Sequence, residues 1–213
     1  MIKEAVVLAG GLGTRLREVV KDVPKPMADI NGKPFLEYLL LFLNKQDIEK
    51  VVLSVGYRYE VIKEYFGDSF LNIHLLYSIE EEPLGTGGAI KKALSFIDED
   101  EVFIFNGDTF FKVDLFKFYE FHSRKKSRLS LALKMMNITD RYAIVEIDEH
   151  HRITAFLEKK ESQGGFINGG IYLMNKEFFL SFNLSDKFSF EQNFLESYYK
   201  DYEFYGFPSD SYF

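Results

Sequence analysis

The sequence contains neither cysteine nor tryptophan among its 213 residues. Without cysteine the chain cannot form disulfides, thiolate metal sites or a cysteine nucleophile. It also lacks a long hydrophobic run, because the longest apolar stretch, residues 38–43, is far too short to cross a bilayer. The first apolar segment has neither the cationic flank nor the cleavage site of a signal peptide. We therefore expect a cytoplasmic protein that does not enter a membrane.

An excess of basic residues is missing as well, since 26 Lys and Arg oppose 33 Asp and Glu and the net charge is −7. This balance argues against general nucleic-acid binding, which needs a basic surface to displace counterions. A polyanionic substrate would have to meet a local cluster of cations and a metal ion. Hydrophobic residues make up 46% and charged residues 28%, as in ordinary globular chains. The length has room for one domain with a sizeable core.

The first thirty residues hold the most informative pattern. An apolar run at residues 5–9 ends in the glycine-rich segment 10–15, GGLGTR. Such a run predicts a buried parallel strand followed by a tight loop and a short helix. The loop suits a phosphate, because glycine lets backbone N–H groups approach oxygens closely, the helix N-terminus adds partial positive charge and Arg15 supplies a fork of donors.

On the pattern alone, a glycine turn without any ligand is an alternative. The dinucleotide-binding fingerprint does not fit, because Leu16 stands where a third small residue is needed and no acidic residue closes a second strand about twenty positions on. A Walker loop does not fit either, since no lysine followed by Ser or Thr comes after the glycines.

Apolar periodicity predicts the elements that follow. Helices are expected at residues 34–46, 59–66, 90–96 and 113–124, and strands at 50–55, 72–79, 101–105 and 129–135. This alternation predicts an α/β fold with a doubly wound, mostly parallel sheet, which binds ligands at the carboxyl ends of its strands. Beyond residue 141, short strands are expected at 142–147, 152–157 and 169–174.

The run LAGGLGTRLR at residues 8–17, followed by VPKPM at 23–27, resembles the signature of sugar-1-phosphate nucleotidylyltransferases. These enzymes join a nucleoside triphosphate to a sugar 1-phosphate. The whole N-terminal segment, through residues 31–40, looks most similar to the branch that acts on D-glycero-D-manno-heptose 1-phosphate with GTP. The resemblance implies one Rossmann-like nucleotidyltransferase domain, with residues 1–128 mainly binding the nucleotide and 129–213 forming a β-rich, mainly sugar-binding half.

In this family the glycine loop wraps the nucleotide, an arginine holds the departing pyrophosphate and a lysine contacts the reacting phosphate. By position, these two residues are Arg15 and Lys25. The nucleotide-binding residues that the resemblance implies are Leu8, Ala9, Gly10, Gly11, Gly13, Thr14, Glu80, Pro83, Gly85 and Thr86.

The segment 80–89, EEEPLGTGGA, is by itself typical of a solvated acidic loop before a glycine-rich helix start. The resemblance implies instead that Pro83 and Gly85 lie against the base and that Glu80 stands where related enzymes read the base edge. A carboxylate only accepts hydrogen bonds, and guanine presents N1–H and N2–H₂ side by side, so this residue favours GTP over uracil or thymine nucleotides. Either of the next two glutamates could serve instead, or all three could face water.

Asp108 follows the predicted strand 101–105 and could by itself simply cap a turn. The resemblance matches it to a Gly–Asp pair whose carboxylate binds Mg²⁺, for which a hard oxygen ligand is suitable. Asp108 is therefore expected to be catalytic and to hold the metal. Family members continue past a segment like residues 211–213 into an Asp-x-Gly-x-Pro motif with a second metal aspartate. The given sequence stops at Phe213, so it lacks this C-terminal end.

The second half resembles the family's sugar-binding part, with its RYG-type strand, its acid–lysine pair and its NGG/GIY segment. Ala143 stands where glycine is usual. By analogy, Glu158 and Asn168 contact sugar hydroxyls and Lys159 meets the sugar phosphate, although the charged run at 158–160 is by itself typical of a solvated loop. The residues expected to bind the sugar phosphate are Gly107, Ala143, Glu158, Lys159, Asn168 and Gly169.

The resemblance implies in-line attack of a sugar 1-phosphate oxygen on the α-phosphorus of GTP, with Mg²⁺ as cofactor, to give GDP-heptose and pyrophosphate for surface polysaccharide synthesis. Mannose 1-phosphate or another hexose 1-phosphate is an alternative substrate. A non-catalytic regulatory module that binds nucleotide-sugars is an alternative from another class, but such a module need not keep Arg15, Lys25 and Asp108 together. The sequence does not define the oligomeric state and leaves a homodimer open.

Overall fold

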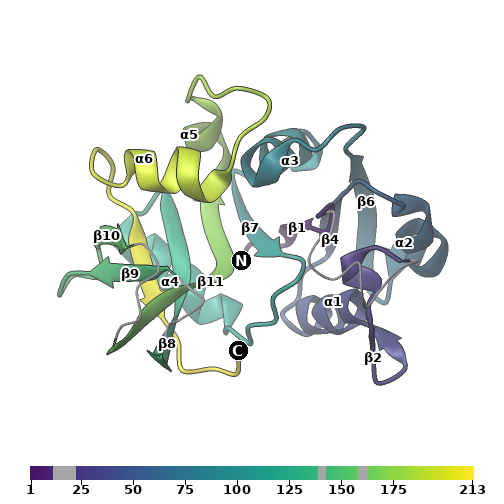
Figure 1. Cartoon of the computed structure of the whole chain (residues 1–213), viewed down its shortest axis with the longest axis horizontal. Helices are drawn as coiled ribbons and strands as arrows, with labels where there is room; N and C mark the ends of the chain where they lie inside the picture. The colour runs from purple at the N-terminus through teal and green to yellow at the C-terminus, as the bar shows by residue number, and fades with distance from the viewer. Residues whose placement is uncertain (12–22, 139–142, 158–162) are drawn as a thin grey trace.

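The computed structural model describes residues 1–11, 23–138, 143–157 and 163–213. Within these ranges, one mixed sheet runs through the whole molecule (Figure 1). Its first half contains the strands β1 (Glu4–Leu8), β4 (Lys50–Val55), β5 (Ser69–Phe70), β6 (Ile73–Ile79) and β7 (Glu101–Asn106). Its second half contains the strands β8 (Leu129–Ile138), β9 (Ile144–Ile147), β10 (Ile153–Leu157), β11 (Gln163–Asn175) and β12 (Tyr205–Pro208).

The strand order is β10-β9-β11-β7-β1-β4-β6-β5, with β8 beside β11 and β12 beside β8. The strands β7, β1, β4 and β6 are parallel to one another, as the sequence pattern predicts. The strand β11 is antiparallel to β7, β8 and β9, so the strands of the second half extend the same sheet in mixed orientation.

Successive side chains of each strand point to opposite faces of the sheet, and both faces of the central strands are apolar. Helices cover both faces and bury these side chains. Val7 of β1 packs in a core with the helices α1 (Phe35–Lys45), α2 (Tyr59–Phe66) and α4 (Leu115–Lys125). Val6 packs in the core of the other face. That second core is covered by α3 (Gly85–Ala93), η2 (Leu94–Phe96), α5 (Lys176–Leu180), η3 (Phe190–Leu195) and α6 (Glu196–Tyr198).

A short segment connects the first strand to α1. It contains the 3₁₀ turn η1 (Lys25–Met27) and the small hairpin of β2 (Asp29–Ile30) and β3 (Lys33–Pro34). The helix predicted directly after the glycine loop lies outside the described residues. Among the described helices, none is long and apolar enough to span a bilayer.

The sequence prediction was wrong about where α3 begins. A helix was expected at residues 90–96, but α3 begins at Gly85 and ends at Ala93. Glycines normally disfavour a helix interior, so the sequence pattern pointed to a loop. The structure gives the reason for the glycines: a Cβ at Gly87 would lie 2.1 Å from the Phe188 ring, and one at Gly88 would lie 2.1 Å from the Asp186 carbonyl oxygen.

Two strands of the second half are also longer than predicted. The expected strand 129–135 extends to Ile138 as β8, and the expected strand 169–174 begins at Gln163 as β11. The two pair with each other along their lengths, with a register shift between Asn168 and Tyr172. Glycines interrupt the apolar pattern of this stretch of β11, so the pattern did not predict a strand here. Backbone hydrogen bonds to the neighbouring strand hold the stretch extended, and a local sequence pattern does not show such bonds.

Candidate active site

The predicted site residues that the structure describes lie at one edge of the sheet. The parallel strands β1, β4, β6 and β7 all end there, so the segments that follow them lie together. The strand β11 arrives from the opposite direction, and its residue Ile171 pairs with Phe105 of β7. The segment just before Ile171, which contains Asn168 and Gly169, therefore lies beside the segment that follows β7, which contains Gly107 and Asp108.

The start of the glycine loop is packed tightly at this edge. The Ala9 N–H donates to the Ser54 carbonyl at 2.7 Å, and Leu8 is half-buried. A Cβ at Gly10 would lie 2.7 Å from Oε1 of Glu80, so only glycine lets the loop pass this carboxylate without a shift. Gly11 is exposed. The remaining loop residues of the prediction, Gly13, Thr14 and Arg15, lie outside the described residues.

Glu80 is the glutamate of its segment that the protein holds in place. Its Oε1 accepts a hydrogen bond from the Ser54 hydroxyl at 3.0 Å, and its Oε2 accepts one from the Leu84 N–H at 3.0 Å. Glu80 is half-buried, whereas Glu81 and Glu82 are exposed. A carboxylate has about four acceptor positions, so two remain for a ligand.

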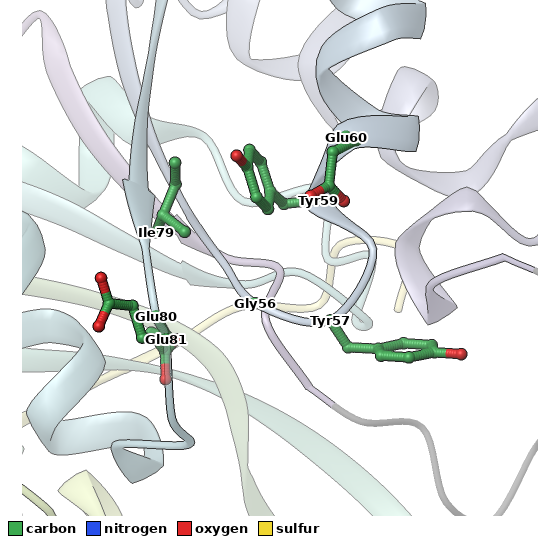
Figure 2. A pocket seen from close by; sticks show the side chains of 7 residues that line it. All are labelled: Gly56, Tyr57, Tyr59, Glu60, Ile79, Glu80 and Glu81. Atoms are coloured by element: carbon green, nitrogen blue, oxygen red, sulfur yellow. The ribbon is translucent and has the colours of Figure 1, made fainter.

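A cavity of about 480 Å³, lined in part by Glu80, lies between the ends of β4 and β6. Figure 2 shows Ile79, Glu80 and Glu81 on one side of it and Tyr59 with Glu60 on the other. Its lining residues are Gly56, Tyr57, Tyr59, Glu60, Ile79, Glu80 and Glu81. The tyrosine rings of this lining can pack against the face of a planar base. Figure 2 shows the Glu80 carboxylate pointing away from these rings.

The segment that leads into α3 connects to a distant part of the chain. Pro83 and Gly85 are exposed, and Gly85 has φ of 71°, a value that favours glycine. The Thr86 hydroxyl donates to Oε2 of Glu191 at 2.7 Å and accepts from the Phe190 N–H at 2.8 Å. Both hydrogen bonds of this hydroxyl are therefore made within the protein.

The fold brings Lys25 and Asp108 into direct contact although they are far apart in sequence. The Lys25 ammonium forms an ion pair with Oδ2 of Asp108, and both side chains are partly exposed, at 34% and 45%. The Gly107 N–H donates to the Leu8 carbonyl at 3.0 Å, and this bond fixes the turn that carries Asp108. A cation and a carboxylate thus lie together at the sheet edge.

Asp108 offers a single carboxylate to a metal ion. Among the described residues, no group of three or more His, Cys, Asp or Glu side chains could hold a metal by itself. Mg²⁺ commonly binds one or two carboxylates and completes its shell with water and substrate phosphates. A partly exposed aspartate at the edge of the sheet fits that mode of binding.

In the half predicted to bind the sugar, the Asn168 side chain is held from two directions. Its Oδ1 accepts from the Gly170 N–H at 2.9 Å, and its Nδ2 donates to the Tyr172 hydroxyl at 2.9 Å. Gly169 is buried against Phe111. Ala143 is exposed and precedes Ile144, which pairs with Ile167 of β11, so Ala143 is close to Asn168. The predicted pair Glu158 and Lys159 lies outside the described residues.

Sequence reasoning missed three residues that support this site: Ser54, Tyr172 and Glu191. Ser54 interrupts an otherwise apolar buried strand, which was the available signal for a buried hydrogen-bonding role. Tyr172 belongs to the GIY segment and Glu191 lies in η3, but neither residue had a predicted contact. Their role depends on tertiary neighbours that no local pattern encodes.

The nucleotidyl transferase family matches residues 4–206, and the chain belongs to this family. It is 54% identical over 210 residues to the D-glycero-alpha-D-manno-heptose 1-phosphate guanylyltransferase of Aneurinibacillus thermoaerophilus, a match that covers 99% of this chain and 91% of the relative. It is 53% identical over 197 residues to the enzyme of the same name from Campylobacter jejuni, covering 92% of this chain and 87% of the relative.

Among solved structures, the crystal structure of HddC from Yersinia pseudotuberculosis complexed with GMP-PN is similar, with a TM-score of 0.86 and 37% identity. The match covers 99% of this chain and 92% of that chain. A putative glucose-1-phosphate thymidylyltransferase from Bacillus anthracis has a TM-score of 0.84 at 19% identity, which shows the shared fold. The predicted α/β nucleotidyltransferase fold is therefore confirmed.

Proposed function

We propose that this protein transfers GMP from GTP to D-glycero-alpha-D-manno-heptose 1-phosphate and forms GDP-heptose and pyrophosphate. The observation that carries the proposal is the gathering of Lys25, Asp108 and Asn168 at one sheet edge, where the nucleotide-side and sugar-side segments meet. The two relatives that are 53% and 54% identical over nearly the whole chain are named for this reaction.

In the proposed reaction, an oxygen of the sugar 1-phosphate attacks the α-phosphorus of GTP. A bond forms between this oxygen and the phosphorus, and the bond from the α-phosphorus to the oxygen that bridges to the β-phosphate breaks. Pyrophosphate leaves with that bridging oxygen. The attacking phosphate is already an anion near neutral pH, so no side chain has to remove a proton. Catalysis then depends on alignment and on stabilisation of negative charge.

The residues proposed for this work are Lys25, Arg15 and Asp108. The Lys25 ammonium neutralises charge on the reacting phosphate, and Arg15 holds the departing pyrophosphate. Asp108 would hold Mg²⁺, which when bound neutralises charge on the triphosphate oxygens. Without substrates, the Lys25 ammonium is paired with Asp108. We propose that the incoming phosphates replace Asp108 as the partner of Lys25 and leave the carboxylate available as a metal ligand.

Guanine recognition is proposed for Glu80. Its carboxylate borders the glycine loop at Gly10 and is held by Ser54 and Leu84, so its free acceptor positions have a defined direction. An acceptor-only group suits the adjacent N1–H and N2–H₂ donors of guanine. We further propose that residues 1–128 bind mainly the nucleotide and 129–213 mainly the sugar. Because GTP is the donor, we propose a cytoplasmic location.

The proposal is tested by pyrophosphate release with Mg²⁺. Each of GTP, CTP, UTP, ATP and dTTP is paired with D-glycero-alpha-D-manno-heptose 1-phosphate and with mannose 1-phosphate. Release only with GTP and the heptose phosphate is expected. Equal or better turnover with mannose 1-phosphate would reassign the sugar, since the chain is also 38% identical to a mannose-1-phosphate guanylyltransferase from Mycobacterium tuberculosis. No release from any pair would refute catalysis and favour a binding module.

A further inference from the structure

A network of polar side chains joins the N-terminus of α3 to β11 beneath the proposed site. It contains Thr86 of α3, Glu191 of η3, Tyr172 of β11 and Asn168 of β11, and Ser189 adds one further hydroxyl. Tyr172 is fully buried at its centre. The network links the segment proposed to contact the nucleotide with the side chain proposed to contact the sugar.

The direction of each hydrogen bond on the sugar side follows from one backbone group. The Gly170 N–H can only donate, so the Asn168 atom 2.9 Å from it must be the acceptor Oδ1. The amide nitrogen Nδ2 then faces the Tyr172 hydroxyl at 2.9 Å and donates to it. The single hydrogen of that hydroxyl is left for Oε1 of Glu191, at 3.2 Å.

The nucleotide side ends at the same carboxylate. The Phe190 N–H donates to the Thr86 hydroxyl at 2.8 Å, and this hydroxyl donates to Oε2 of Glu191 at 2.7 Å. The Ser189 hydroxyl also donates to Oε2, at 3.1 Å. An ionised carboxylate only accepts, so it satisfies all three hydroxyls at once. Both chains of hydrogen bonds therefore start at a backbone N–H and end at Glu191.

Tyr172 keeps its proton under ordinary conditions. Burial raises the pKa of its hydroxyl well above the usual 10.0, and the nearby charge of Glu191 raises it further, while hydrogen bonds from Asn168 and Asn106 act in the other direction. The hydroxyl therefore remains a donor to Glu191 and an acceptor for the Asn168 amide throughout the working pH range. Reversing this direction would leave a buried donor facing the Asn168 nitrogen, which is costly.

We propose that Tyr172 and Glu191 are positioning residues, which hold the Asn168 amide in the one orientation that leaves its second Nδ2 hydrogen for a sugar hydroxyl. This inference rests on the proposed function, because it assigns Asn168 to the sugar 1-phosphate. Neither Tyr172 nor Glu191 needs to touch a substrate. The link through Thr86 also ties this orientation to the start of α3.

The test measures KM for each substrate separately in the wild type, Tyr172→Phe, Asn168→Ala and the double variant. Tyr172→Phe removes only the hydroxyl. We expect it to raise KM for the sugar 1-phosphate by about tenfold, the effect of one hydrogen bond, and to change KM for GTP by less than about twofold. Because Tyr172 acts through Asn168, the double variant should be no worse than Asn168→Ala alone.

Tyr205→Phe is the matched control. It removes a hydroxyl that also donates to a glutamate, Glu203 at 3.1 Å, but at an exposed position away from the site. We expect both KM values to stay at the wild-type level in this variant. If Tyr172→Phe does not yield folded protein, Glu191→Gln replaces it in the same cycle, because an amide cannot accept from both the Tyr172 and the Thr86 hydroxyls.

The outcomes separate this inference from the proposed function. A wild-type protein that releases no pyrophosphate from any substrate pair refutes the proposed function, and the inference falls with it. A wild-type protein that is active, with variants whose effects add or raise both KM values equally, refutes the positioning role alone. A selective and non-additive effect on the sugar 1-phosphate supports it.

Discussion

Replacing Glu80 with glutamine tests guanine recognition at a single atom. The Leu84 N–H can only donate, so the amide oxygen of the new side chain must occupy the position of Oε2. The amide nitrogen then falls at the position of Oε1, beside Ser54 and Gly10. The Ser54 hydroxyl can rotate and accept from it. The fold should therefore tolerate Glu80→Gln, while the atom next to the glycine loop changes from an acceptor to a donor.

The expected effect on catalysis is large and specific to the base. A hydrogen bond to a charged group contributes about 1.5–3 kcal/mol, so kcat/KM with GTP should fall roughly 10- to 150-fold. The preference for GTP over ATP should narrow as well, because adenine presents an acceptor at N1 that an amide N–H can meet. Pyrophosphate release with each nucleotide measures both quantities, and thermal denaturation checks the fold.

Glu82→Gln is the matched control, because it makes the same change at an exposed neighbour. It should keep the wild-type kcat/KM and nucleotide preference. Wild-type kcat/KM and an unchanged GTP preference in Glu80→Gln would refute the reasoning. If Glu82→Gln were the variant that lost the preference for GTP, Glu82 and not Glu80 would be the residue that recognises the base.

Three further changes have defined outcomes. Lys25→Ala and Asp108→Ala should each lower kcat about several-hundred-fold, the effect of losing one preorganised charged group. Both variants should keep the wild-type melting temperature, because an ion pair whose side chains are 34% and 45% exposed contributes little stability. Near-normal turnover would remove either residue from the mechanism. Gly87→Ala should lower the free energy of unfolding by about 1–3 kcal/mol in urea titrations, since its Cβ would lie 2.1 Å from the Phe188 ring, and an unchanged midpoint would contradict this close packing. Hydrogen bonds from the backbone N–H of Arg152 and of His150 hold the pKa of Asp148 below its ordinary 3.8, so the ionised carboxylate stabilises the fold above pH 3.8 and this stability is lost as the pH falls through the lower folded pKa. Asp148→Asn should therefore flatten the fall in stability at acid pH. The same fall in wild type and variant would rule out a contribution from Asp148.

Local pattern was sufficient where an element depends on its own residues. The strand at 50–55 and the helix at 59–66 were predicted with the bounds that β4 and α2 have, because the apolar pattern of their own residues marks both ends. It failed where tertiary contact sets the residue type. The glycines of α3 are required by the close approach of residues 186–188, so a pattern that normally indicates a loop occurs within a helix.

The same contrast between local pattern and tertiary contact applies to the residues of the site. The resemblance of the motifs named Lys25 and Asp108, but their contact depends on the sheet order that places the end of β7 beside that of β1. Ser54, Tyr172 and Glu191 were missed because each acts on another side chain and not on a ligand motif. Their positions follow from strand register and helix packing, which a single sequence does not report.

The pairing of β7 with β11 leaves no hinge within the described sheet between the proposed nucleotide-binding half and the proposed sugar-binding half. Five consecutive residue pairs, from Ile171 with Phe105 to Asn175 with Glu101, hold the two strands in register. A rigid-body closure of one side onto the other would have to break this ladder in the middle of the sheet. The two phosphates must therefore be brought together by loops and side chains at the sheet edge, and the strands of the free and the substrate-bound protein should superimpose closely.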